Sequence, residues 1–281
     1  MHRVSAYIPC YNDAAYIGRA IACLKQQTRQ PDELFVVDDR SDDQSADEAQ
    51  AAGVRIIQMP KNLGRGAVRA LAMQNAAHEL VLCLDASKQV GPDFLERALP
   101  WFEDSKVAAV WGTMDKEGVN LPERWMIRHL LPPLRQEAVV HRTFLSTAAA
   151  LLRKSSVMQV GNFDASFRHR EDLDLSNRLL AADFDVVFDP ELKVNLLSSE
   201  SVWTVLDRDW RWKCWPGKVD LRTYVTHINR AFSKRLGKDL AAGDLPAAAL
   251  TMIAPHFYFW RSRFPSTCHS HIVTDKPSST S

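Results

Sequence analysis

The chain has 281 residues, of which 46% are hydrophobic and 25% charged, and its formal net charge is +1 at pH 7. This composition is typical of a globular protein and excludes a disordered or collagen-like chain. The near-neutral charge gives no support for nucleic-acid binding, which usually shows as a strongly basic face, so we expect no nucleic-acid partner.

The five cysteines are scattered and form no C-x-x-C pair, so we expect neither a disulfide framework nor a zinc site. The sequence begins directly with a strand-like segment instead of a signal peptide. It contains no apolar run of the ~18 residues that a membrane span needs. We therefore expect a cytoplasmic protein.

The first 112 residues alternate between strand-like and helix-like segments, a pattern that indicates βαβ units and a mostly parallel sheet. Strands are expected at 4–8, 34–37, 54–58, 80–84 and 107–111. Helices are expected between them at 14–26, 45–52, 66–77 and 92–102. The fold class is therefore α/β.

The pattern is looser at 115–142, a segment that we expect to cross the edge of the sheet and face a second substrate. The later elements are expected in this order: a strand at 145–152, a helix from 155, a helix from 172, a strand at 186–188, and helices after 198. Polar residues rich in Ser, Thr and Pro at 267–281 predict a disordered tail.

Three of the expected strands stop at polar residues. Their ends read Pro9-Cys10-Tyr11-Asn12, Asp38-Asp39-Arg40-Ser41 and Asp85-Ala86-Ser87-Lys88. The carboxyl ends of parallel strands meet at one edge of the sheet, which is where ligands bind in open α/β sheets. The chain is therefore expected to build one site from three strand ends.

Asp38 and Asp39 are adjacent carboxylates that repel each other unless a partner uses them. A nucleotide base or ribose offers N–H and O–H donors that a carboxylate accepts well. The alternative is that Asp38 or Ser41 caps the following turn. We favour a ligand contact for Asp39 and leave both interpretations open for Asp38.

These segments resemble, in order and spacing, those of the inverting family 2 nucleotide-sugar glycosyltransferases. The matching segments are Ile8-Pro9-Cys10-Tyr11-Asn12, Val37-Asp38-Asp39-Arg40-Ser41-Asp42-Asp43, Asn62-Leu63-Gly64-Arg65-Gly66-Ala67-Val68-Arg69, Asp85-Ala86-Ser87-Lys88 and Pro92-Asp93-Phe94-Leu95. Each segment is weak alone, but together and in this order they form a strong signal over roughly the first two thirds of the chain.

The resemblance implies a GT-A fold, a mostly parallel central sheet flanked by helices, here with a helical C-terminal extension. It divides the chain into a GT-A domain at 1–198 (a nucleotide-binding half at 1–112 and an acceptor half at 113–198), a helical region at 199–266 and the tail at 267–281. It implies that the donor is a nucleoside diphosphate sugar, and the donor expected first is a UDP-sugar. The sugar would pass with inversion to a hydroxyl of a glycan, a lipid-linked glycan or a protein.

The resemblance also assigns the donor site. Asp39 would contact the base, with Pro9, Tyr11 and Asp38 beside it at the strand ends. Glycines 64 and 66 would let the backbone approach a ligand, and Arg65 could meet a phosphate. The alternative for Arg65 is a surface arginine at an ordinary helix start.

Asp85-Ala86-Ser87 occupies the place of the family's Asp-x-Asp motif, whose carboxylates bind a divalent cation, Mn²⁺ or Mg²⁺, at the diphosphate. Asp85 is retained as a metal ligand, but Ser87 replaces the second acid and Lys88 replaces a frequent third one. A hydroxyl is a poor ligand compared with a carboxylate, and the lysine could supply part of the missing positive charge. The resemblance therefore leaves metal dependence open.

Glu171-Asp172 looks like the family's catalytic acid pair at a helix N-terminus, and the lead-in at 161–164 matches as well. Inverting transfer needs a carboxylate to remove the acceptor proton. Asp172 would be this base, with Glu171 orienting or replacing it. The alternative is that the two acids only stabilise the helix dipole.

Two later segments each allow two interpretations. The segment at 208–212 is similar to the R-x-x-R-W element of processive relatives. By this resemblance, Arg208 and Arg211 could bind the diphosphate and Trp212 could stack on a sugar. A packed helix face with extended arginines is equally supported. The apolar segment at 245–260, followed by arginines, favours a buried helix. Peripheral contact with the inner face of the membrane is the alternative.

Loss of the second acid at Ser87 supports an alternative function. The protein would then be a non-catalytic or donor-hydrolysing relative that acts as a binding or scaffold protein in glycan assembly.

Overall fold

The computed structural model describes residues 2–115, 118, 120–131, 137–197, 201–214 and 219–263. The tail expected at 267–281 lies outside the described residues, as does part of the loosely patterned segment at 115–142.

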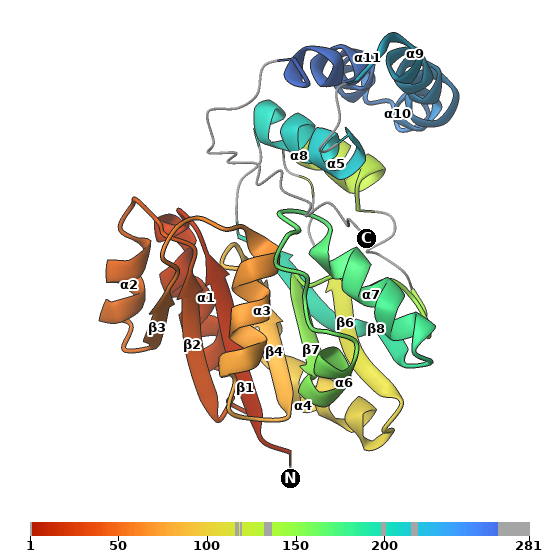
Figure 1. Ribbon diagram of the computed structural model, residues 1–281. Helices are drawn as coiled ribbons and strands as arrows, with labels where there is room; N and C mark the ends of the chain where they lie inside the picture. The colour runs from red at the N-terminus through yellow and green to blue at the C-terminus, as the bar shows by residue number, and fades with distance from the viewer. Residues whose placement is uncertain are drawn as a thin grey trace, which may run out of the picture.

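One mixed sheet forms the centre of the protein (Figure 1). Its strands are β1 (Val4–Cys10), β2 (Glu33–Asp38), β3 (Arg55–Gln58), β4 (Leu80–Leu84), β5 (Lys88–Val90), β6 (Val107–Met114), β7 (Ala149–Arg153) and β8 (Asp185–Leu196). Within the described residues they lie in the order β3-β2-β1-β4-β7-β6-β8-β5. The first four are parallel to one another, whereas β7 is antiparallel to both β4 and β6, and β5 is antiparallel to β8.

Helices cover both faces of the sheet. They are α1 (Ala14–Lys25), α2 (Ser45–Ala51), α3 (Arg65–Asn75), α4 (Phe94–Ala98), the short 3-10 helix η1 (Leu99–Glu103), α6 (Lys154–Gln159) and α7 (Glu171–Ala181). Side chains alternate between the faces along each strand. In β1, Ala6 and Ile8 belong to the core shared with α1, whereas Tyr7 belongs to the core shared with α3, α6 and α7.

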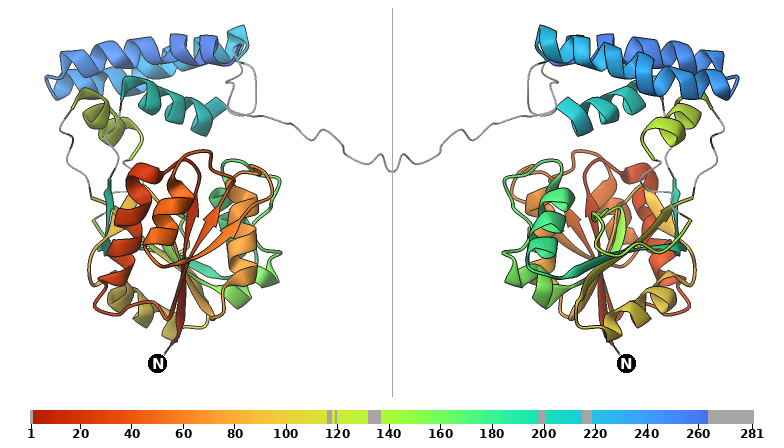
Figure 2. Two further views of the ribbon diagram at one scale, coloured as in Figure 1. Left: turned by 90° about the vertical axis from the view of Figure 1, so that its left-hand side faces the viewer. Right: turned by 90° about the vertical axis from the view of Figure 1, so that its right-hand side faces the viewer.

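A separate helical layer lies over the end of the sheet that is opposite the N-terminus (Figures 1 and 2). It contains α5 (Leu121–His129), α8 (Val202–Cys214), α9 (Leu221–Arg230), the π-helical turn η3 (Ala231–Leu236), α10 (Gly237–Ala241) and α11 (Leu245–Arg261). Most of this layer comes from the C-terminal region, which is helical as expected. None of these helices, nor any other in the described part of the chain, is both long and apolar enough to span a membrane.

The helix α5 joins this layer although it lies in the middle of the chain. Trp125 donates a hydrogen bond from Nε1 to Thr251 Oγ1 at 2.8 Å, and Arg128 forms an ion pair with the buried Asp239 at 2.6 Å. Thr251 Oγ1 also donates to Asp239 at 2.6 Å. The residue ranges of the domains stay a prediction, but α5, from the predicted acceptor half, packs with α8 and α11.

The structure differs from the sequence prediction in four elements. The strand β5 and the helix α5 were not predicted. The strand expected at 186–188 is much longer, and the helix expected at 92–102 is divided into α4 and η1. Residues 88–90 are too few for a sequence pattern, and they form a strand because they pair with the second half of β8.

Candidate active site

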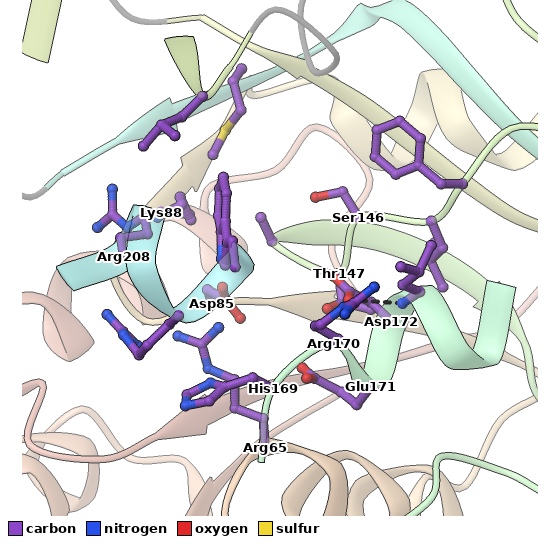
Figure 3. Close-up of a pocket in the computed structure, with 18 of the residues that line it drawn as sticks. Arg65, Asp85, Lys88, Ser146, Thr147, His169, Arg170, Glu171, Asp172 and Arg208 are labelled. Atoms are coloured by element: carbon purple, nitrogen blue, oxygen red, sulfur yellow. Dashed lines mark hydrogen bonds between the residues drawn. The ribbon is translucent and has the colours of Figure 1, made fainter. Parts of the chain in front are cut away.

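A pocket of about 450 Å³ lies between the carboxyl edge of the sheet and the helical layer (Figure 3). Nine of the predicted site residues line it: Arg65, Asp85, Ser87, Lys88, Glu171, Asp172, Arg208, Arg211 and Trp212. They come from the ends of β4, the N-termini of α3 and α7, and one face of α8. The predicted residues Pro9, Tyr11, Asp38 and Asp39 are not among the lining residues.

The carboxylate of Asp39 holds the loop that precedes α3. It accepts hydrogen bonds from the backbone N–H groups of Leu63 and Gly64, both at 2.8 Å. Burial raises the pKa of Asp39, while these two N–H groups oppose that shift. Asp38 accepts from the hydroxyl and the backbone N–H of Ser41, the turn-capping arrangement considered as its alternative. A contact of either carboxylate with a nucleotide stays a prediction.

The glycines at the start of α3, Gly64 and Gly66, lie where two chain segments meet. Gly66 N donates to Phe167 O at 3.0 Å, and Arg168 donates to Asn62 Oδ1 at 2.8 Å. A Cβ on Gly66 would lie 2.3 Å from Asp164 O, so a side chain cannot fit there. The close approach that we predicted for a ligand is here made by the loop that leads into α7.

Arg69 connects the two acidic parts of the pocket. Its buried guanidinium donates from Nη2 to Asp85 Oδ1 at 2.8 Å and from Nε to Glu171 Oε1 at 3.0 Å. It also donates to Cys83 Sγ in β4. Arg69 therefore fixes the positions of the β4 end and the α7 start relative to each other. It makes these internal ion pairs instead of the phosphate contact that an arginine of the segment at 62–69 could make.

Asp172 has the electrostatic properties of a general base. Burial, followed by the charge of Glu171, raises the pKa of Asp172 to about 6. Its Oδ1 accepts a hydrogen bond from Leu173 N at 2.8 Å. Just before it, Arg170 has φ +68°, a left-handed conformation that is unfavourable for a residue with a side chain and that is often found at functional sites.

Cations gather on one side of the pocket. Figure 3 shows Arg65, Lys88 and Arg208 on the same side as Asp85, with Asp172, Ser146 and Thr147 across from them. Burial opposes ionisation of Asp85, but the charges of Arg69, Arg65 and Lys88 outweigh it and hold the pKa of Asp85 below its usual value. Burial and nearby arginines lower the pKa of His169 to about 3, so this imidazole is neutral at pH 7.

The helix α8 presents its two faces to different surroundings. Asp209 and Trp210 are buried, and Asp209 forms an ion pair with Arg235 at 2.7 Å. On the pocket side, Arg211 pairs with Asp207 at 2.9 Å, and burial lowers the pKa of Arg211. The sequence allowed either a packed helix face or a face toward the site for the segment at 208–212. In the structure, the segment has one face of each kind.

The residues at the Asp-x-Asp position do not fit a divalent cation. One oxygen of Asp85 is engaged by Arg69, and the Ser87 hydroxyl accepts a hydrogen bond from Lys88 Nζ at 3.0 Å. Within the described ranges, no group of three or more His, Cys, Asp or Glu side chains could hold a metal ion. Asp85, the predicted metal ligand, thus has no second acid within its own segment at 85–88.

Sequence reasoning missed several lining residues. Ser146 and Thr147 stand in a loop without a motif, and Arg170 directly precedes the Glu171-Asp172 pair but was given no role. An apolar wall is formed by Met126, Leu130 and other residues of the helical layer. The sequence analysis missed this wall because it did not predict α5, the helix that contributes Met126.

Comparisons with known proteins agree with the geometry. Residues 5–168 match the model of the family described as "Glycosyl transferase family 2". The chain is similar to the pre-mycofactocin glycosyltransferase of Mycobacterium tuberculosis, with 30% identity over 200 residues that cover 67% of this chain and 42% of that relative. The chain therefore spans less than half the length of this curated relative.

Two solved structures are similar over almost the whole chain. One is the mannosyltransferase PcManGT from Pyrobaculum calidifontis in complex with GDP-Man and Mn²⁺, with a TM-score of 0.61, 16% identity, and coverage of 94% of this chain and 88% of that one. The other is S. aureus TarS 1-349, with a TM-score of 0.56, 16% identity, and coverage of 93% and 91%. This similarity confirms the GT-A fold expected from the sequence.

Proposed function

Because the chain belongs to glycosyl transferase family 2, we propose that it transfers a sugar, with inversion, from a nucleoside diphosphate sugar to an acceptor hydroxyl in the pocket beneath the helical layer. The observation that carries this proposal is the pairing, in one pocket, of a cation-rich side with a carboxylate of raised pKa.

The donor diphosphate would bind on the cationic side. Arginine forms charge-assisted, often bidentate hydrogen bonds with phosphate oxygens, and Arg208 and Arg211 stand one helical turn apart on α8. Trp212 would stack on a sugar at the mouth of this region. The expected donor was a UDP-sugar, but the neighbour from Pyrobaculum holds GDP-Man, so both nucleotides must be tested.

Asp172 would act as the base of the reaction. The acceptor oxygen attacks the anomeric carbon while the bond to the diphosphate oxygen breaks, and the hydroxyl proton passes to the Asp172 carboxylate. Attack from the side opposite the leaving group gives inversion. Glu171 is held by Arg69, so we assign it an orienting role.

A donor panel and one substitution test this function. We expect one of UDP-, GDP-, dTDP- or CMP-sugars to raise the melting temperature, as any ligand specific for the folded state does. In the presence of an acceptor mixture, that donor should release its nucleotide: a nucleoside diphosphate from UDP-, GDP- or dTDP-sugars, and CMP from CMP-sugars. Asp172→Asn should bind the donor but lose release by at least about 100-fold, the usual contribution of a general base. The control Asp174→Asn, in an acid that pairs with Arg178, should keep turnover.

The same assay distinguishes the proposed transferase from the alternative, a non-catalytic binding protein. Donor binding without turnover in the unmodified protein, for every acceptor offered, would favour the non-catalytic relative. Turnover that Asp172→Asn leaves unchanged would remove Asp172 from the mechanism.

We also propose that the acceptor reaches the site at a membrane surface. The helix α11, for which this contact was the alternative to burial, packs one face against α5, α8 and α9. A clearer apolar stripe runs along α9 and η3, where Leu221, Val225 and Phe232 are exposed at spacings of four and seven residues.

Basic residues flank this stripe, namely Arg222, Arg230 and Lys234. An exposed apolar stripe with basic neighbours fits an anionic lipid surface. The protein should therefore sediment with phosphatidylglycerol vesicles more than with phosphatidylcholine vesicles. Val225→Glu with Phe232→Glu should abolish this binding, whereas the control Met158→Glu, an exposed apolar site on α6, should not. Equal binding by both variants would argue against the stripe.

A further inference from the structure

We infer that this pocket binds the donor diphosphate through its own arginine and lysine side chains, without a divalent cation. This inference rests on the proposed function and concerns how the same site neutralises its substrate.

Asp85 already has a cationic partner within the protein. A metal site at a diphosphate needs several hard oxygen ligands on the protein or its substrate. Here one Asp85 oxygen lies 2.8 Å from Arg69 Nη2. Where further acids would be, the Lys88 ammonium donates a hydrogen bond to the Ser87 hydroxyl. The nearby Asp13, whose pKa is raised by burial to about 6, accepts a hydrogen bond from Tyr11 N and does not line the pocket.

Positively charged residues outnumber carboxylates in the pocket lining. Six arginine or lysine residues line the pocket: Arg65, Arg69, Lys88, Arg170, Arg208 and Arg211. Three carboxylates line it: Asp85, Glu171 and Asp172. With His169 neutral, six positive and three negative groups leave an excess of three positive charges. That excess matches a nucleoside diphosphate and disfavours an added metal ion.

Lys88 is held at this position by the fold. It begins β5, its side chain is buried, and its backbone pairs with Leu196 of β8, another lining residue. Its positive charge acts on Asp85, whose pKa it helps to hold below the usual value. The ammonium beside Ser87 therefore stands as a fixed positive charge in the region where relatives with the full motif would place the metal ion.

Arg211 supplies the second fixed charge from the helical layer. Asp207 pairs with Arg211 at 2.9 Å and with Arg261 at 2.8 Å, so the position of Arg211 is set by α8 and α11 together. Lys88 from the sheet and Arg211 from the helical layer both line the pocket that a diphosphate would fill.

The test measures binding of UDP and GDP by calorimetry, in excess EDTA and in millimolar Mn²⁺. We expect the dissociation constant of the bound nucleotide to agree between the two conditions within about twofold. Lys88→Met and Arg211→Met should each weaken binding by at least about tenfold, because each removes a charge from the phosphate site. Lys88→Arg, which keeps the charge, should retain binding.

A reciprocal variant makes the test sharper. Ser87→Asp combined with Lys88→Ala restores the second acid and removes the ammonium, so its nucleotide binding should become dependent on Mn²⁺. Its unliganded melting curve shows whether it folds; if it does not, the EDTA comparison on the unmodified protein decides alone.

The outcomes distinguish the two claims. Binding that is lost in EDTA and restored by Mn²⁺ overturns the metal-free site but leaves the proposed function standing, with Asp13 as the acid to test next. Failure of both nucleotides, and of the dTDP and CMP compounds of the donor panel, to bind under either condition overturns the proposed function and this inference with it.

Discussion

Replacement of the buried Arg69 by methionine should destabilise the protein strongly. The Arg69 side chain is 1% exposed and is paired with two carboxylates, Asp85 at 2.8 Å and Glu171 at 3.0 Å. Methionine fills a similar space but offers no charge. The variant therefore leaves both acids beside an apolar side chain.

The size of the effect follows from the exposure of these partners. Glu171 is 3% exposed, so water cannot replace the lost cation, whereas Asp85 at 21% can gain some solvent. Removal of one partner from a buried pair costs about 3–5 kcal/mol. We expect Arg69→Met to lower the free energy of unfolding by that amount, with most of the loss arising at Glu171.

Urea denaturation at pH 7, followed by circular dichroism, measures this loss. Arg97→Met is the matched control, since Arg97 forms an exposed ion pair with Asp93 within one helix and should change stability far less. Adding Glu171→Gln to Arg69→Met should recover part of the loss, because the second acid is then neutral. A loss in Arg69→Met no larger than in the control would refute the reasoning.

Three further predictions concern pH, packing and the helical layer. The rate of transfer should fall below about pH 6, because the base must be ionised and burial raises the pKa of Asp172 to about 6. Since this raised pKa means that the ionised group destabilises the fold, Asp172→Asn should melt higher than the unmodified protein at pH 8, with a difference that shrinks as the pH falls from 6 toward 4. Gly66→Ala should lower stability by about 1–3 kcal/mol in urea titrations because its Cβ meets two carbonyl oxygens, whereas Gly18→Ala, in a helix and with nothing within 4 Å, should not destabilise. Asp239→Ala should lower stability by about 3–5 kcal/mol, because this buried carboxylate pairs with Arg128, with the buried His129 and with the Thr251 hydroxyl; an effect below about 1 kcal/mol in the same titration would contradict this.

The central strands could be predicted from sequence because they are buried on both faces. β4 appears as five consecutive apolar residues, all of them buried, and its bounds were predicted without error. The elements that were missed depend on partners far away in the chain. β5 has only three residues and exists through its pairing with β8, about 100 positions later.

The site could be predicted as a set of residues but not as a set of contacts. Asp85 and Asp172 were expected to share one site, and both line the pocket. Arg69, which pairs with Asp85 and with Glu171 next to Asp172, lies 102 positions before Glu171, and nothing local in the sequence indicates that pairing. The carboxylate of Asp39 accepts hydrogen bonds from the loop before α3, which sequence spacing alone does not reveal; its contact with a ligand stays a prediction.

The position of α5 also has a consequence for synthesis on the ribosome. The buried Trp125 of this helix donates its hydrogen bond to Thr251, 126 residues later. At translation rates of about 5–20 residues per second, α5 waits roughly 6–25 s before its partner emerges. During that interval its apolar face is uncovered, so a nascent chain stalled before α11 should expose it to chaperones even when the sheet beneath has already folded.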